Sequence, residues 1–127
     1  MKIYRSSFAI KKKFQSPVVA IGNFDGVHLG HQEILRKVIQ KAKKIKGTSV
    51  IYTLFPPPAC VLRPNIHVPQ ILTLKDRLKK IEESGINIVI IEKFSLRFSR
   101  KTAQEFFDEI ILKNLKTKIL YVGYNFF

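Results

Sequence analysis

Short apolar runs alternate with helix-like stretches along this chain, and that alternation restricts its fold more than any other feature. The run at 17–22 is rich in β-branched residues and ends in glycine, which is typical of a buried strand before a tight turn. The stretch after it has apolar residues at helical spacing, namely Ile34, Leu35, Val38, Ile39, Ala42 and Ile45. Gly47 closes that helix, and 48–55 is a second strand rich in Val, Ile, Tyr and Thr. These residues predict one β-α-β unit.

The second half of the chain repeats this order twice. Both of its predicted helices begin with a capping pair, Thr73 with Asp76 and Thr102 with Glu105. Apolar strands follow these helices at 86–91 and 118–123. Strands that are apolar throughout and separated by helices pair in parallel, are covered on both faces and have right-handed crossovers. The sequence therefore predicts an α/β, Rossmann-like fold, with an open parallel sheet of four strands and helices on both faces.

Prolines interrupt the middle of the chain. They are Pro56, Pro57, Pro58, Pro64 and Pro69. Proline lacks the N–H that a helix interior or a central strand requires, so neither element is expected to persist there. We predict a long shaped loop between the second strand and the second helix.

The chain is strongly basic, with 23 Lys and Arg against 9 Asp and Glu and a net charge of +14. Such a charge attracts anionic partners at long range, and nucleic acid, acidic lipid and ATP all fit this description. Many lysines, such as Lys37, Lys41 and Lys44, have helical spacing and are expected to form a solvated face. Because the aromatic residues are not interleaved with the basic ones, we expect no specific nucleic-acid partner.

The sequence also bears on the cellular location of the chain. No apolar run approaches the roughly 20 residues that span a bilayer. The N-terminus lacks the continuous apolar core and the cleavage site of a secretory signal. Cys60 is the only cysteine, so an intrachain disulfide is excluded. These features predict a soluble, cytoplasmic protein without a membrane partner.

Glycine-bounded turns follow the first and fourth predicted strands, at 22–31 and 123–127. In an open parallel sheet, ligands bind outside the carboxyl ends of the strands, where the winding direction reverses. If the first and fourth strands are neighbours, both turns face one crevice. Gly22 and Gly26 permit tight turns, while the first turn of the following helix offers free N–H groups to an anion. A nucleotide phosphate is the expected ligand.

His28 and His31 are three residues apart at the start of this helix, with Gly30 between them. At about 100° per residue they project from nearly the same side, so both imidazoles can reach one anion. The same pair could instead cap the helix or lie in solvent. A zinc site would require a spacing of four residues and a nearby carboxylate, as in His-Glu-x-x-His, so we predict no metal bound by this pair.

The longest motif in the chain lies at 22–32 and reads Gly-Asn-Phe-Asp-Gly-Val-His-Leu-Gly-His-Gln. It resembles the signature of bacterial FAD synthetases, the bifunctional riboflavin kinase/FMN adenylyltransferases, within the wider His-x-Gly-His nucleotidyltransferases. Further segments at 53–58, 72–73 and 122–126 resemble other segments of that family.

This resemblance implies transfer of AMP from ATP, with Mg²⁺, to the phosphate of the substrate FMN, which gives FAD and pyrophosphate. By similarity, His28 and His31 are catalytic and contact the ATP phosphates. The ATP-binding turn by similarity includes Gly22, Phe24, Asp25 and Gly30, with Asn125 on the opposite lip. The flavin side is assigned by similarity to Asn23, Pro56 and Pro58. Phe24 could equally be a core residue.

The resemblance also sets the expected extent of the domain. Residues 1–127 are expected to be an incomplete FMN adenylyltransferase domain, without the C-terminal riboflavin kinase domain, and to be impaired or inactive by themselves. One alternative is another His-x-Gly-His transferase, acting on pantetheine phosphate or nicotinate mononucleotide. The other is a non-catalytic basic remnant that binds nucleotide or nucleic acid.

Overall fold

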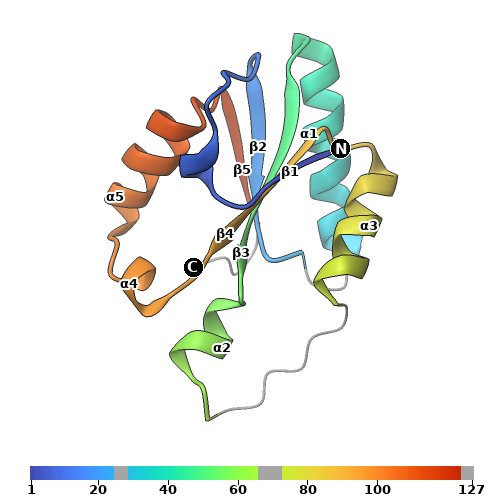
Figure 1. Cartoon of the computed structure of the whole chain (residues 1–127). Helices are drawn as coiled ribbons and strands as arrows, with labels where there is room; N and C mark the ends of the chain where they lie inside the picture. Colours follow the sequence, from blue (N-terminus) through green and yellow to red (C-terminus); the bar gives the residue numbers. More distant parts are fainter. Residues whose placement is uncertain (25–28, 66–72, 124–127) are drawn as a thin grey trace.

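A computed structural model of the chain describes residues 1–24, 29–65 and 73–123. Within them, five parallel strands form one open sheet in the order β1-β4-β3-β2-β5 (Figure 1). The strands are β1 (Lys2–Tyr4), β2 (Pro17–Ile21), β3 (Thr48–Phe55), β4 (Ile88–Lys93) and β5 (Ile119–Val122). Helices lie on both faces of the sheet, so the predicted Rossmann-like α/β fold is confirmed.

The predicted number of strands is wrong by one, because the sequence analysis did not find β1. This strand pairs in parallel with β4, with Lys2 opposite Ile88 and Tyr4 opposite Ile90. It has only three residues and none of them is buried, so it lacks the apolar run that marked the other strands. Pairing with a strand far along the chain, rather than local sequence, makes this segment a strand.

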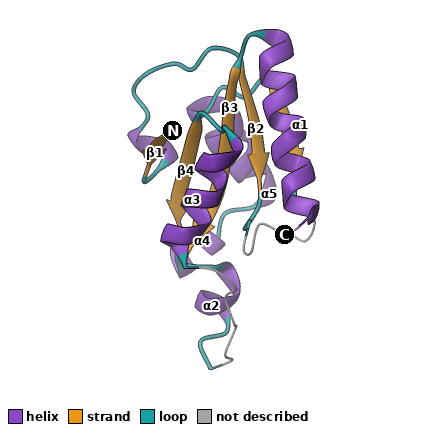
Figure 2. Cartoon of the chain, turned by 90° about the vertical axis from the view of Figure 1, so that its right-hand side faces the viewer, coloured by secondary structure: helices purple, strands orange, loops and turns teal. Residues whose placement is uncertain are grey.

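Two layers of helices enclose the sheet. One layer consists of α1 (Leu29–Ile45) and α3 (Leu74–Ser84), which lie in front of the sheet in Figure 2. The layer on the opposite face consists of η1 (Ser7–Ala9), α4 (Leu96–Ser99), α5 (Ala103–Phe106) and the π-helical segment η3 (Phe107–Asn114). Both figures show α2 (Pro58–Leu62) beyond the carboxyl end of β3.

Alternate residues of the central strands point into these two layers. Val18 and Ala20 of β2 belong to the core on the α1 and α3 side, whereas Val19 and Ile21 belong to the core on the η3 side. All of these side chains are buried. Fully burying a Val or Ile side chain contributes roughly 1.5–3 kcal/mol to stability. Burial on both faces keeps β2 in the middle of the sheet and so fixes the turn that follows it.

The predicted helix starts are confirmed, but the proline-rich segment is not a loop throughout. Thr73 accepts a hydrogen bond from the Asp76 amide, and Thr102 and Glu105 form a reciprocal capping box. α2 begins at Pro58, contrary to the expectation that the prolines would exclude a helix. Proline is tolerated at the first helical position because that N–H would have no partner within the helix.

A buried carboxylate and a buried phenol lie on the face of the sheet that η1, α5 and η3 cover. Glu92 of β4 accepts hydrogen bonds from the Ser7 amide at 2.7 Å and from the Ser7 hydroxyl at 2.8 Å, which fastens η1 to the sheet. Burial raises the pKa of the Tyr52 hydroxyl well above its ordinary value, and the negative charge of Glu92 acts in the same direction. The Tyr52 hydroxyl therefore stays protonated at neutral pH.

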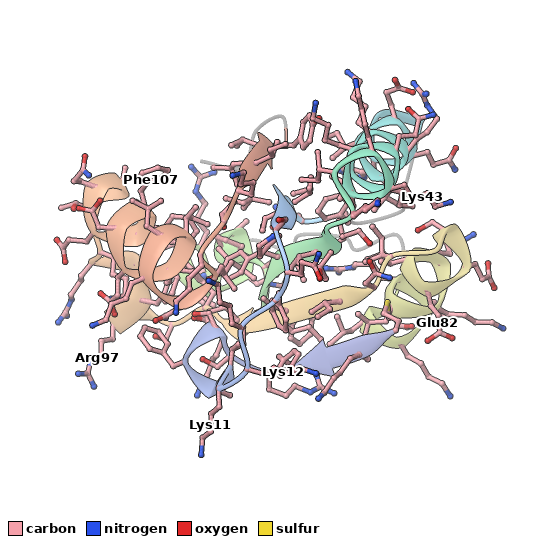
Figure 3. All side chains as sticks on the ribbon, turned by 90° about the horizontal axis from the view of Figure 1, so that it is seen from above. Lys11, Lys12, Lys43, Glu82, Arg97 and Phe107 are labelled. Carbon is pink, nitrogen blue, oxygen red and sulfur yellow. The ribbon has the colours of Figure 1, made fainter. Side chains whose placement is uncertain are left out.

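Most of the positive charge lies on the outer surface. Lys37 and Lys44 of α1 are exposed and Lys41 is half-buried, so the predicted solvated face is largely confirmed. Figure 3 shows Lys11, Lys43 and other labelled side chains pointing away from the body of the protein.

Candidate active site

The chain changes its winding direction between β2 and β5. From β2 the sheet extends through β3 to β4 on one side, whereas β5 pairs with β2 on the other side. The two strands are parallel, with Val18 opposite Ile119 and Ile21 opposite Val122. Their carboxyl ends therefore lie together at the position where open α/β sheets bind ligands. The first and fourth predicted strands are thus neighbours, which is the condition under which both turns face one crevice.

Two glycines bring the ends of these strands into contact. The Gly123 amide donates a hydrogen bond to the Ile21 carbonyl at 2.6 Å. A Cβ atom on Gly123 would come 2.9 Å from that carbonyl oxygen and 3.4 Å from the Cα atom of Gly22. Because real Cβ atoms do not approach backbone this closely, the contact requires glycine at position 123.

Phe24 fastens the turn after β2 to the protein core. Its side chain is fully buried in the core on the α1 and α3 side. Its backbone is left-handed, with φ of 54°, which is uncommon for an aromatic residue. A Cβ atom on Gly22 would come 2.8 Å from the Phe24 ring, so Gly22 leaves room for that ring. The core role considered for Phe24 is confirmed, and any effect of Phe24 on a nucleotide would act through the shape of the turn.

His31 lies in the first turn of α1, close to this anchor. The His31 ring is half-buried, and its centroid is 5.1 Å from the centroid of the Phe24 ring. The helix dipole makes this end of α1 electropositive. Gly30 belongs to the same helical turn. A donor side chain and a helix N-terminus thus lie together beside the end of β2.

Three of the predicted site residues lie outside the described residues. They are Asp25, His28 and Asn125. The proposed pairing of His28 with His31 on one ligand therefore stays a prediction.

Asn23 connects the turn to α3, through a residue that the sequence analysis missed. Its backbone carbonyl accepts a hydrogen bond from Nη1 of Arg77 at 3.0 Å and one from the Thr53 hydroxyl at 3.4 Å. Its side-chain oxygen Oδ1 is buried and has no hydrogen-bond partner among residues 1–24, 29–65 and 73–123. Arg77 could have been found because it lies on the helical face that Leu74 and Ile81 direct toward the sheet.

An apolar cavity of about 330 Å³ lies on the other side of the sheet, between α2 and α5. Its lining includes Leu54, Pro58, Phe94, Phe98 and Phe106. The Phe98 ring packs edge-on against the Phe94 ring, at a centroid distance of 5.8 Å, and against the Phe106 ring, at 6.3 Å. Such a cavity suits a planar aromatic ligand. Of the residues assigned to the flavin side, Pro58 lines this cavity, whereas Pro56 and Asn23 are not in its lining.

Comparison with known proteins identifies the relatives of the chain. The sequence profile of the FAD synthetase family matches residues 10–127. A bifunctional riboflavin kinase/FMN adenylyltransferase from Buchnera aphidicola subsp. Acyrthosiphon pisum is 31% identical over 99% of the chain and 40% of its own length. The protein of the same description from Escherichia coli K12 is 36% identical over 86% of the chain and 35% of its own length. The chain thus spans less than half the length of these relatives.

A solved structure has a similar fold. It is a crystal structure from Streptococcus pneumoniae that is described as a macrolide-efflux protein, with a TM-score of 0.82 and 32% sequence identity. The match covers 98% of the chain and 42% of the Streptococcus chain. In the described part of our chain, none of the helices combines the length and the apolar character that crossing a membrane requires.

Proposed function

Because the chain belongs to the FAD synthetase family, we propose that it transfers the AMP group of ATP to the phosphate of FMN, forming FAD and pyrophosphate. We also propose that residues 1–127 form part of an adenylyltransferase domain. The observation that carries the proposal is the contact of Gly123 with Ile21 and Gly22 at the carboxyl ends of β5 and β2, close to the first turn of α1. This arrangement offers an anion site at the switch point of the sheet.

The reaction fits what these residues can supply. An oxygen of the FMN phosphate attacks the α-phosphorus of ATP, the bond from that phosphorus to the bridging oxygen breaks, and pyrophosphate leaves with the bond electrons. Such a transfer needs positioning and stabilisation of charge on the phosphorus oxygens rather than a covalent protein intermediate. His31 and the α1 N-terminus are suited to that role, with His28 as the second imidazole donor. ATP enters as its Mg²⁺ complex, since Mg²⁺ usually binds through substrate phosphates.

The apolar cavity is the proposed site of the flavin ring. Its aromatic lining suits stacking or edge contact with a planar heterocycle. Pro58 forms the part of the cavity wall at the start of α2. The cavity lies at the end of the sheet where β3 ends. The turn that begins at residues 22–24, which we call the nucleotide turn, follows β2 at the same end. Asn23 Oδ1 is a buried acceptor that a polar group of FMN could satisfy.

A change in this cavity should weaken flavin binding selectively. We expect Phe98→Ala to weaken FMN binding by about tenfold or more, because truncating a large aromatic contact typically costs more than 1 kcal/mol. Quenching of FMN fluorescence by the purified chain measures this affinity. Phe107→Ala is the matched control, because Phe107 is 41% exposed and does not line the cavity.

The same measurement separates FMN from the substrates of related transferases. Pantetheine phosphate, added at concentrations that match FMN, is expected not to displace the flavin. Displacement by pantetheine phosphate, or an equal loss of FMN affinity in the Phe98→Ala and Phe107→Ala variants, would contradict the proposed flavin site.

A further inference from the structure

Arg77 is a charged side chain enclosed by the protein directly beneath the nucleotide turn. It is 1% exposed and lies in the first turn of α3, where its amide bonds to the Thr73 carbonyl. Arginine is almost never buried this completely unless it is paired. The Arg77 guanidinium donates from Nη1 to the carbonyl oxygen of Asn23, a residue far away in sequence. This hydrogen bond links α3 to the residues that follow β2.

The hydrogen bond from Arg77 fixes one peptide group of the turn. The Thr53 hydroxyl of β3 donates to the same Asn23 carbonyl, so this oxygen is held between α3 and β3. Because the peptide group is planar and trans, the N–H of Phe24 points in the opposite direction, away from Arg77. The buried, left-handed Phe24 holds the far side of this peptide group. The direction of one backbone donor is thus set from both sides.

We propose that Arg77 is a positioning residue for the phosphates of the nucleotide. By holding the Asn23 carbonyl inward, it presents the Phe24 N–H outward as a donor to the anionic ligand. Successive amides in a turn that contains a left-handed residue form a concave anion site. This inference rests on the proposed function. Arg77 acts on the phosphates of ATP indirectly, through the orientation of the Phe24 N–H.

A comparison of ATP with adenosine isolates this role. The ¹⁵N-labelled chain is titrated with each ligand, and the amide resonances of Gly22 and Phe24 are followed by NMR. We expect Arg77→Met to weaken ATP binding by about tenfold or more, the effect of losing a charge-assisted hydrogen bond, with adenosine affinity changed less than about twofold. Arg77→Lys retains the charge and should recover part of the ATP affinity. Lys79→Met is the control, because it removes an exposed cation from the same helix.

Each outcome of this experiment decides a different point. An equal loss of ATP and adenosine affinity in Arg77→Met would show a purely structural role and overturn the inference. If Arg77→Met does not fold, Thr53→Val takes its place, with an expected loss of about threefold in ATP affinity from one neutral hydrogen bond. Unchanged ATP affinity in that variant would overturn the inference as well. A wild-type chain whose turn resonances do not respond to ATP would contradict the proposed function itself, and the inference with it.

Discussion

His31→Ala is expected to lower the rate of FAD formation by about 100-fold or more, since removing one donor aimed at developing charge typically costs about 3 kcal/mol. The assay uses a chimeric protein in which the chain is followed by the part of the Escherichia coli relative that lies beyond the matched region. Initial rates at saturating ATP and FMN measure the effect on turnover. We expect this loss of turnover because His31 lies in the first turn of α1, beside the end of β2.

A second substitution separates hydrogen bonding from packing. The His31 ring contacts the buried Phe24 ring, so loss of the ring could disturb the turn without any role in charge stabilisation. His31→Phe keeps an aromatic ring at this contact and removes both ring nitrogens. We expect it to be as impaired as His31→Ala while retaining the wild-type unfolding free energy more closely. A His31→Phe variant within twofold of the wild-type rate would show that the histidine acts by packing alone.

Gly123→Ala is expected to be the most damaging change at the carboxyl end of β5. The added methyl group would meet the Ile21 carbonyl oxygen at 2.9 Å, which forces the ends of β2 and β5 apart. Overpacking of this kind costs about 1–3 kcal/mol of stability. Because the same displacement moves the turn that we propose binds the phosphates, we expect the KM for ATP of the chimeric protein to rise by about tenfold or more. Urea unfolding and ATP saturation curves measure the two effects.

Gly85→Ala provides the control for Gly123→Ala. Gly85 ends α3 in the left-handed region, with φ of 99° and no atom within 4 Å of an added Cβ. Its substitution should cost about 1 kcal/mol through backbone strain alone and leave the KM for ATP unchanged. An equal rise of KM in both variants would mean that the effect of Gly123→Ala comes from general destabilisation.

The central sheet was predictable because its strands have strong local signals. β2 and β3 are buried on both faces, and the helices between the strands carry capping residues and terminal glycines. β1 and α2 were missed for opposite reasons. β1 has almost no local signal and depends on its distant partner β4, whereas α2 begins at a proline that local rules treat as a helix breaker.

The candidate site was predictable only in part. The glycine turn followed from the motif, whereas the pairing of β2 with β5 was only a condition in the sequence analysis and comes from the structure. The contact between Arg77 and Asn23 did not, because two residues 54 positions apart meet only through the packing of α3. The aromatic cavity was also missed. Phe98 and Phe106 belong to short helices on the η3 side of the sheet, and the glycine-turn motif gives no information about that side.

Product analysis of the chimeric protein tests the proposed function most directly. The protein is incubated with FMN, ATP and Mg²⁺, and in parallel with pantetheine phosphate in place of FMN, and the products are separated by chromatography. We expect FAD and pyrophosphate to form in equal amounts, with no adenylylated pantetheine phosphate. Turnover of pantetheine phosphate above that of FMN, or the absence of FAD from a folded protein that binds both ATP and FMN, would contradict the assignment.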